Sequence, residues 1–489
     1  MTTPPPECPA HGLGPGGLRR LYGPEAAADP MALYEKLRAE HGAVAPVLVH
    51  GDLNAWLVLG HHENLEAMRN PSRFSRDSRI WRHFRDGNVA MDSPLLPMVA
   101  WQPLCVFADG AEHERLRGAV TTSMGRLNRR GIRQHIIRFS NQLVDEFCQS
   151  GKVELVTQFA EQLPVLVMTQ LLGMPEEYGP RLVEAGRDLM RGTETAVASN
   201  EYVLSACRQL VQRKRADPGG DLTSWLLRHE AELTDDEVAE HLRLILIAAN
   251  EPTVNFIVGA LKMVLTDPRF RAHLSGGHMT LPDALEQVLW DEPSIAVVPG
   301  RWATGDTELG GQRIEEGDMV MFGIAAGNVD PRVRPDLSTP VHGNRSHLAF
   351  SSGPHECPGK DIARAIVDTA IDTLLMRLPD LRIAVPEEEL TSEAAWISRH
   401  LVALPAEFSP AKPLGDQASG PGEPQPSGEA RIPQTPPKPR LSGTAPTVGA
   451  ELPPAQPEPV YDPRPAAAIP PQRRSWWRAL ASRLGVRRR

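Results

Sequence analysis

One helix signal in the middle of the chain limits the fold more than any other feature. Thr234 and Glu237 have the spacing of a capping box, which marks a helix start. The helical pattern then runs to residue 265, where Thr266-Asp267-Pro268 predicts a stop. A helix of roughly 32 residues is about 48 Å long at 1.5 Å per residue. Because Leu244 to Ala249 is apolar on every side, the helix is predicted to be buried and to cross a large domain.

Composition divides the remainder of the chain. After a flexible N-terminus, residues 1–19, we expect residues 20–408 to form one large, mostly helical domain with some short strands. Residues 409–471 hold 18 prolines among 63 residues. Such a segment buries too little apolar surface to offset its ordering entropy, so it is predicted to be disordered.

The last residues, 472–489, form a basic tail. They contain seven arginines and no acidic residue, and Trp476, Trp477 and Leu480 fall on one arc if the tail is helical. An amphipathic basic segment of this kind could bind an anionic membrane surface or a protein partner. A disordered tail without such a role fits almost as well, because an isolated helix this short is only marginally stable.

Charge and cysteine usage exclude several classes of protein. The formal net charge of −9 argues against a nucleic-acid-binding protein. We find no run of about 20 apolar residues that could span a membrane, and the first residues lack the apolar core of a secretory signal. Five scattered cysteines, an odd number, fit a reducing cytoplasm better than a disulfide framework. We therefore expect a cytoplasmic protein, with peripheral membrane attachment through 472–489 as an option.

The segment Phe350–Gly359 carries the strongest chemical signal. It ends just before a helix predicted from about Lys360 to Leu378, and a cysteine near a helix N-terminus is favoured as a thiolate. Gly353 and Gly359 permit a tight loop that aims backbone amides at the sulfur of Cys357. A buried structural cysteine is the simplest alternative reading. A zinc site is a second one, but no other Cys or His pair completes four ligands.

The pattern Phe-x-x-Gly-x-His-x-Cys-x-Gly, followed by Ala363-Arg364, resembles the haem-binding loop of the cytochrome P450 family. The resemblance covers about residues 20–408. It implies a triangular, mainly helical domain with a small β region and a haem b whose iron is bound by the thiolate of Cys357. His113 and Arg117, one helical turn apart, and Arg301 on a strand resemble the family's ligands of the haem propionates. The other residues that the resemblance places around the haem are Phe350, Gly353, His355 and Gly359.

The family's activity implies an oxidoreductase that inserts one oxygen atom from dioxygen into a small hydrophobic substrate. Since the chain shows no flavin or nicotinamide site, electrons from NAD(P)H are expected to arrive through a ferredoxin reductase and a ferredoxin. A group of arginines could steer an acidic ferredoxin, although an ordinary solvated helix face is as good a reading: Arg115, Arg126, Arg129, Arg130 and Arg133. Substrate-contacting residues are expected mainly from residues 77–103, residues 192–202 and the strand after Val297.

The long helix departs from the family where an acid and a threonine relay protons. Glu251 matches the acid, but Pro252 stands in the place of the threonine. Proline removes an N–H, so a kink or a widened turn is expected, and Thr253 could then supply the hydroxyl. Otherwise water or a substrate hydroxyl carries the proton. This departure motivates an alternative function, a haem-thiolate sensor or scaffold with little or no turnover.

A second departure concerns the helix predicted from about Asp283 to Trp290, where the family carries Glu-x-x-Arg. Gln287 and Trp290 replace the acid and the arginine, and His342 replaces a third partner in a later loop. Losing one partner of a buried charge network costs about 3–5 kcal/mol, so we interpret all three residues as a neutral, hydrogen-bonding substitute. The alternative is that Glu286 and Arg345 form the pair, shifted by one register.

Overall fold

The computed structural model describes residues 17–90, 93–191, 194–267, 280–341, 343–394 and 397–414. The predicted disordered segment beyond residue 414 and the basic tail therefore lie outside the described residues. The described chain continues to contact the domain past Phe408. The Ala411 N–H donates to the Cys148 carbonyl at 2.8 Å, and the Leu414 N–H donates to the Asp145 carboxylate at 3.0 Å.

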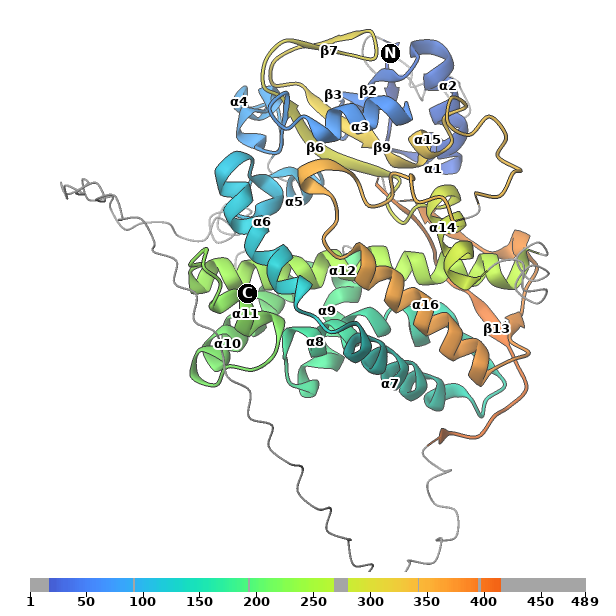
Figure 1. The fold of residues 1–489 in the computed structure, drawn as a ribbon. Helices are drawn as coiled ribbons and strands as arrows, with labels where there is room; N and C mark the ends of the chain where they lie inside the picture. The colour runs from blue at the N-terminus through green and yellow to red at the C-terminus, as the bar shows by residue number, and fades with distance from the viewer. Residues whose placement is uncertain are drawn as a thin grey trace, which may run out of the picture. The chain divides into compact units, whose positions relative to one another are not determined.

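A mixed sheet forms one end of the described domain (Figure 1). Met319 and Met321 of strand β9 pack into one apolar cluster, whereas Val320 and Phe322 pack into another. Because successive side chains of a strand point to opposite faces, this sheet is covered on both sides. In the order of hydrogen bonding, its strands are β1 (Arg19–Arg20), β2 (Val44–Val49), β3 (Leu53–Val58), β9 (Met319–Gly323), β6 (Val297–Ala303) and β4 (Phe74–Ser75).

Small sheets complete the β structure of the described residues. One has three antiparallel strands, and the other two are hairpins. Their strands are β10 (Arg382–Ile383), β13 (Pro405–Glu407) and β5 (Lys152–Glu154); β11 (Ser392–Ala394) and β12 (Arg399–Leu401); β7 (Thr307–Leu309) and β8 (Gln312–Ile314).

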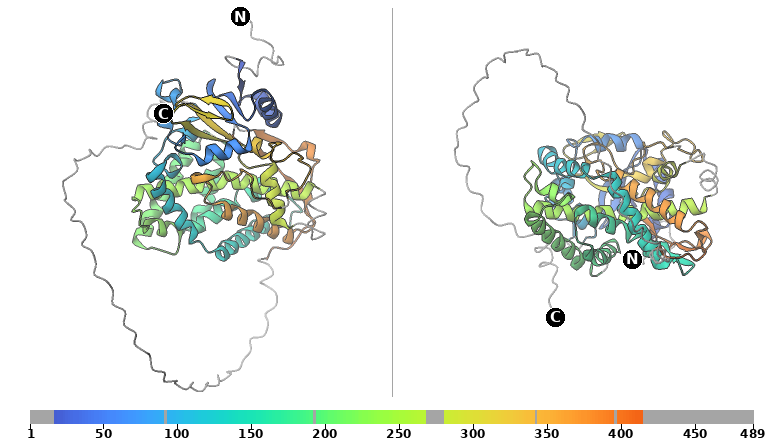
Figure 2. Two further views of the ribbon diagram at one scale, coloured as in Figure 1. Left: turned by 45° about the horizontal axis from the view of Figure 1, so that its top comes forward. Right: turned by 60° about the horizontal axis from the view of Figure 1, so that its bottom comes forward.

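Helices form the larger part of the domain and share one apolar core. Figures 1 and 2 show the sheet at one end and helix α12 (Asp235–Thr266) crossing the helical part. The expected mainly helical architecture with a small β region is confirmed. The other helices are α1 (Pro24–Ala28), α2 (Pro30–His41), α3 (His61–Arg69), α4 (Arg82–Arg85), α5 (Leu96–Val99), α6 (Gly110–Gly125), α7 (Arg129–Phe147), α8 (Leu163–Leu172), α9 (Gly179–Arg191), α10 (Ala196–Ala216), α11 (Leu222–Leu227), α14 (Leu281–Asp291), α15 (Ile324–Asn328) and α16 (Lys360–Arg377).

Helix α12 begins and ends where its sequence signals predict. The Thr234 hydroxyl accepts the Glu237 N–H and the Glu237 carboxylate accepts the Thr234 N–H, which completes the capping box. By length and composition, α12 is the one helix among the described residues that could cross a membrane. However, 56% of its most apolar window is buried inside the domain, as in the core helix of a globular protein.

Of the two distortions expected at Pro252, a kink or a widened turn, the widened turn is absent, because the helix stays α-helical through this residue. The apolar stretch Leu244 to Ala249 is also not buried on every side, because Ala248 is exposed. This residue and three of its neighbours line an internal cavity, described below, which explains why a fully apolar stretch does not pack on all sides.

Candidate haem site

A cavity of about 310 Å³ lies between α12 and the loop that carries Cys357. Helix α12 contributes Ala248, Ala249, Pro252 and Thr253 to one wall, together with larger aliphatic side chains. Phe350, His355, Cys357 and Gly359 of the cysteine loop border the same cavity, as does Arg117 of α6. The structure thus brings most of the predicted haem-binding residues to one cavity. Its remaining described walls are mostly aliphatic, which suits a flat apolar macrocycle and an apolar substrate.

The backbone of the cysteine loop turns sharply around Cys357. Its N–H donates to the Phe350 carbonyl at 2.9 Å. Gly353 has a φ of +74°, and a Cβ at this position would lie 2.8 Å from the Met68 carbonyl oxygen, so a glycine is required there. Burial raises the pKa of the Cys357 thiol, while the backbone N–H of Gly359 and the charge of Arg117 oppose that rise. These two groups favour the thiolate.

A second cysteine, Cys105, also borders the cavity. It lies in the turn before α6, and its backbone N–H donates to His241 Nε2 at 3.2 Å. Burial raises the pKa of its thiol too. The glycines and the N-terminus of α16 surround Cys357 and not Cys105, which makes Cys357 the better candidate for an anionic sulfur.

A buried basic group lies at one side of the cavity. The rings of His113 and His355 are 4.1 Å apart between centroids, and His355 Nε2 lies 3.3 Å from Asp109 Oδ1. Arg301 is 2% exposed, and among the described residues its Nε and Nη1 have no hydrogen-bond partner; the same is true of His113 Nε2. A buried guanidinium without an anion is costly, so these donors fit the carboxylates of haem propionates.

Sequence reasoning missed Arg76, which is buried beside Arg301. Its guanidinium donates to the carbonyls of Val106, Pro299 and Gly300 at 2.7–2.9 Å, and burial lowers its pKa to about 10. No sequence signal marks this arginine, because two of its acceptors are backbone groups more than 220 residues away.

Arg117 uses two of its guanidinium nitrogens for contacts within the protein. It donates to the Glu356 carbonyl, next to Cys357, and to the Thr121 hydroxyl at 3.1 Å. It therefore braces the cysteine loop from α6 while it borders the cavity.

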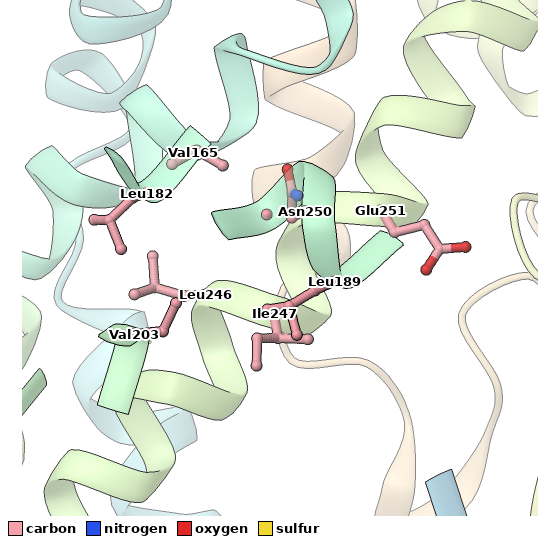
Figure 3. A pocket seen from close by; sticks show the side chains of 9 residues that line it. Val165, Leu182, Leu189, Val203, Leu246, Ile247, Asn250 and Glu251 are labelled. Carbon is pink, nitrogen blue, oxygen red and sulfur yellow. The ribbon is translucent and has the colours of Figure 1, made fainter. Parts of the chain in front are cut away.

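The predicted acid and hydroxyl lie on opposite sides of α12. Thr253 lines the cavity that contains Cys357, whereas Glu251 lines a second cavity of about 410 Å³. The Ser398 hydroxyl donates to Glu251 Oε1 at 3.1 Å, and burial raises the pKa of this carboxyl. Figure 3 shows the Glu251 carboxylate directed away from a small apolar pocket that includes Val165 and Leu182. The structure does not bring Glu251 together with Cys357.

The residues that replace Glu-x-x-Arg are all hydrogen-bonded. Gln287 accepts the Val341 N–H at 2.8 Å and donates to Asp291 at 2.7 Å. The Trp290 indole donates to the Asn344 carbonyl at 2.7 Å. Both contacts tie α14 to the later loop, as a neutral substitute would. His342 lies outside the described residues.

A charged group lies beside these neutral residues on the same helix. Glu286 is also buried, and its carboxylate contacts Arg364, His347 and Arg345. The neutral contacts of Gln287 and the ionic contacts of Glu286 therefore occur together. Adjacent residues of a helix point about 100° apart, so these two side chains reach different partners.

Of the segments expected to contact substrate, one borders the cavity beside Cys357. Val298 lines the cavity as expected, but no described residue of 77–103 or 192–202 does. Trp81, Leu95 and Val99 pack instead into the apolar cluster on one face of the sheet. Leu244, Ile245 and Phe256 of α12 contribute cavity wall that was not expected.

No family model matches the chain. Over 391 residues it is 30% identical to the 2-hydroxy-5-methyl-1-naphthoate 7-hydroxylase of Streptomyces carzinostaticus, which covers 77% of this chain and 95% of that protein. Over 344 residues it is 33% identical to cytochrome P450-SU2 of Streptomyces griseolus, covering 69% and 83%. The solved structure of CYP154A1 from Streptomyces coelicolor A3(2) is 30% identical, with a TM-score of 0.69 over 79% of this chain and 98% of that one.

Proposed function

The chain belongs to the cytochrome P450 family, and on this premise we propose that Cys357 binds the iron and that the cavity beside it takes a small hydrophobic substrate. The enzyme is an oxidoreductase of the monooxygenase kind, it binds haem b, and its electrons come from NAD(P)H through partner proteins. Once bound, haem b supplies the redox chemistry that activates dioxygen. The observation that supports the proposal best is that Cys357 and Thr253 border one largely apolar cavity.

The buried basic group would hold the propionates. The unpaired donors of Arg301 and His113 offer hydrogen bonds to carboxylates, and burial strengthens such charge-assisted bonds. Arg76 adds positive charge close by. Phe350, Gly353, His355 and Gly359 would shape the loop that presents the sulfur. In this proposal Arg117 has a double role, bracing the Glu356 carbonyl and facing the cofactor.

Thr253 is the residue we propose for proton transfer inside the cavity. Glu251, on the other side of α12, would take up protons from the second cavity, because a carboxyl with a raised pKa holds a proton near neutral pH more readily than an ordinary one. Thr253→Ala should divert electrons into hydrogen peroxide, whereas Thr253→Ser should keep them coupled to product. Equal peroxide yields from both variants would argue against a role for the hydroxyl.

For the electron donor we propose an acidic ferredoxin that docks beside the cysteine loop. Arg126 and Arg130 are exposed there. Arg129 lies 3.4 Å from Asp361 but is 89% exposed on the surface, and Arg115 is paired with Glu112 and Glu237. The arginine group is thus only partly neutralised. Reduction by ferredoxin should slow with rising salt, and Arg126→Glu should weaken it further.

We expect the enzyme in the cytoplasm, as for its bacterial relatives. Membrane or partner binding by residues 472–489 stays a prediction. Recovery with anionic liposomes should be compared between the full chain and a chain ending at Leu414, the last described residue. Equal recovery of the two chains with the liposomes would show that residues 472–489 do not bind an anionic membrane.

Two cysteine variants and a substrate screen test the proposal. Cys357→Ala should abolish the thiolate-type Soret spectrum of the dithionite-reduced carbon monoxide complex, and Cys105→Ala should leave it unchanged. Steroids, fatty acids, macrolides and terpenes should then be screened for spectral shifts, followed by turnover with NADPH, ferredoxin and its reductase. Binding without any oxygenated product, with all electrons lost to peroxide, would favour the sensor or scaffold function instead.

A further inference from the structure

A buried carboxylate close to the cysteine loop is not explained by the haem-binding residues. Glu286 of α14 is 1% exposed. Arg364 of α16 binds it twice, from Nε to Oε1 at 2.6 Å and from Nη2 to Oε2 at 2.9 Å. Arg345 approaches the same carboxylate at 3.5 Å. A bidentate pair of this kind is both strong and directional, since the planar guanidinium matches the carboxylate.

His347 completes the surroundings of Glu286, and both of its ring nitrogens have partners. Its Nδ1 lies 3.2 Å from the Ala349 backbone N–H, which can only donate, so Nδ1 accepts. Nε2 lies 3.0 Å from Glu286 Oε2 and 3.3 Å from Arg364 Nη2. Both side chains are 2% exposed. Burial would raise the pKa of Glu286, but the bonds from His347 and Arg364 outweigh it and bring the pKa to about 2.

The two donors to Glu286 also contact the aromatic ring of the cysteine loop. The Arg364 guanidinium lies 4.6 Å from the centroid of the Phe350 ring, and the His347 ring lies 5.8 Å from it. The carbonyl of Phe350 accepts the Cys357 N–H at 2.9 Å. A continuous set of contacts therefore runs from Glu286 to the residue proposed as iron ligand.

We propose that Glu286 is a positioning residue for Cys357: it fixes Arg364 and His347, which hold the ring of Phe350 and through it the loop around the sulfur. Gln287 does not have this role, since it bonds Asp291 and the Val341 N–H. When the carboxylate is replaced by an amide, Arg364 keeps one acceptor oxygen but loses the second and the opposite charge, so its position over the Phe350 ring is no longer fixed.

The test compares two buried carboxylates that each accept a bidentate pair of hydrogen bonds from an arginine. Glu286→Gln keeps the shape of the side chain and removes its charge. Glu63→Gln is the matched control, because Glu63 is 8% exposed and is bound by Arg332 at 3.0 and 2.6 Å on a different helix, α3. The purified haem-loaded proteins are measured for Tm, for the Soret position of the reduced carbon monoxide complex and for haem loss to an excess of apomyoglobin.

We expect both variants to lower the Tm. Glu286→Gln alone should move the carbon monoxide complex toward the spectrum of a neutral-thiol ligand and speed haem loss about tenfold, the size of effect seen when groups that orient a metal ligand are removed. If Glu286→Gln folds too poorly to purify, Arg364→Lys, which keeps the charge but not the fork, should show the same spectral change. A wild-type spectrum and haem-loss rate in whichever variant is measured would overturn the proposal and leave Glu286 a structural residue.

Discussion

Restoring the family's arginine at position 290 should destabilise this protein. Trp290 is fully buried, and the Arg334 guanidinium lies 5.5 Å from its ring centroid. Arg334 is 6% exposed and is paired with Asp291 at 2.7 Å. In Trp290→Arg, a second guanidinium would take the place of the ring. Two like charges 5.5 Å apart repel by about 3 kcal/mol at an effective dielectric constant of about 20, and the cation–π contact is lost as well.

Trp290→Phe is the control for the lost side chain. It removes the hydrogen bond to the Asn344 carbonyl, worth about 1 kcal/mol, and some packed volume, worth about 1–2 kcal/mol more. It keeps an aromatic face for Arg334. By thermal unfolding followed by circular dichroism, we expect the Tm to fall in the order wild type, Trp290→Phe, Trp290→Arg.

Gln287→Glu completes the experiment. Alone, it places a carboxylate beside Asp291, which Gln287 now contacts at 2.7 Å, so it should also lower the Tm. Combined with Trp290→Arg, the new acid and the new base can pair, and the double variant should be more stable than the sum of the single changes allows. Equal Tm values for Trp290→Arg and Trp290→Phe would refute the reasoning, because repulsion between Arg334 and a second arginine would then have no measurable effect on stability.

Three further outcomes follow from the geometry. Gly353→Ala should lower the Tm and haem occupancy of the purified protein, because the added Cβ would meet the Met68 carbonyl and the backbone is left-handed there. Asp330, whose pKa falls to about 2 because hydrogen bonds from Arg332 outweigh its burial, stabilises the fold above about pH 4 and loses this effect as the pH falls toward 2. Asp330→Asn should therefore flatten the acid limb of the Tm profile. Arg301→Met should raise the free energy of unfolding of the apoprotein by roughly 1–3 kcal/mol, and with it the Tm, because two nitrogens of this buried guanidinium lack an acceptor among the described residues. The same change should weaken haem binding.

Local signals explain what the sequence predicted well. The ends of α12 follow from the capping box at Thr234 and the proline after residue 267, both of which act within one helical turn. The cysteine loop could be predicted because its residues are contiguous in the sequence. Its glycines also adopt backbone conformations that other residues rarely do, as the positive φ of Gly353 shows. Helix α16 begins at Lys360, as expected from the same segment.

Contacts between distant segments explain what was not predicted. Arg76 serves backbone carbonyls of a strand far along the chain, so nothing near it in the sequence marks it. The partners of Glu286 come from a loop and a helix more than 60 residues away. Aligning Gln287 with the family's acid says nothing about Glu286, because its partner Arg364 lies on another helix.

The separation of Glu251 from Thr253 follows from helix geometry alone. Two residues differ by about 200° around an undistorted α-helix, so an acid and a hydroxyl two positions apart face opposite sides. Since α12 stays α-helical here, no widened turn brings the two side chains to the same side. Pro252 has another effect: it lacks an N–H, so the Ala248 carbonyl loses the donor that normally stands four residues later in an α-helix. Ala248, Pro252 and Thr253 all border the cavity. This wall therefore carries a hydroxyl on the side of Cys357, whereas Glu251 faces the second cavity, so a proton from Glu251 could not pass directly to Thr253.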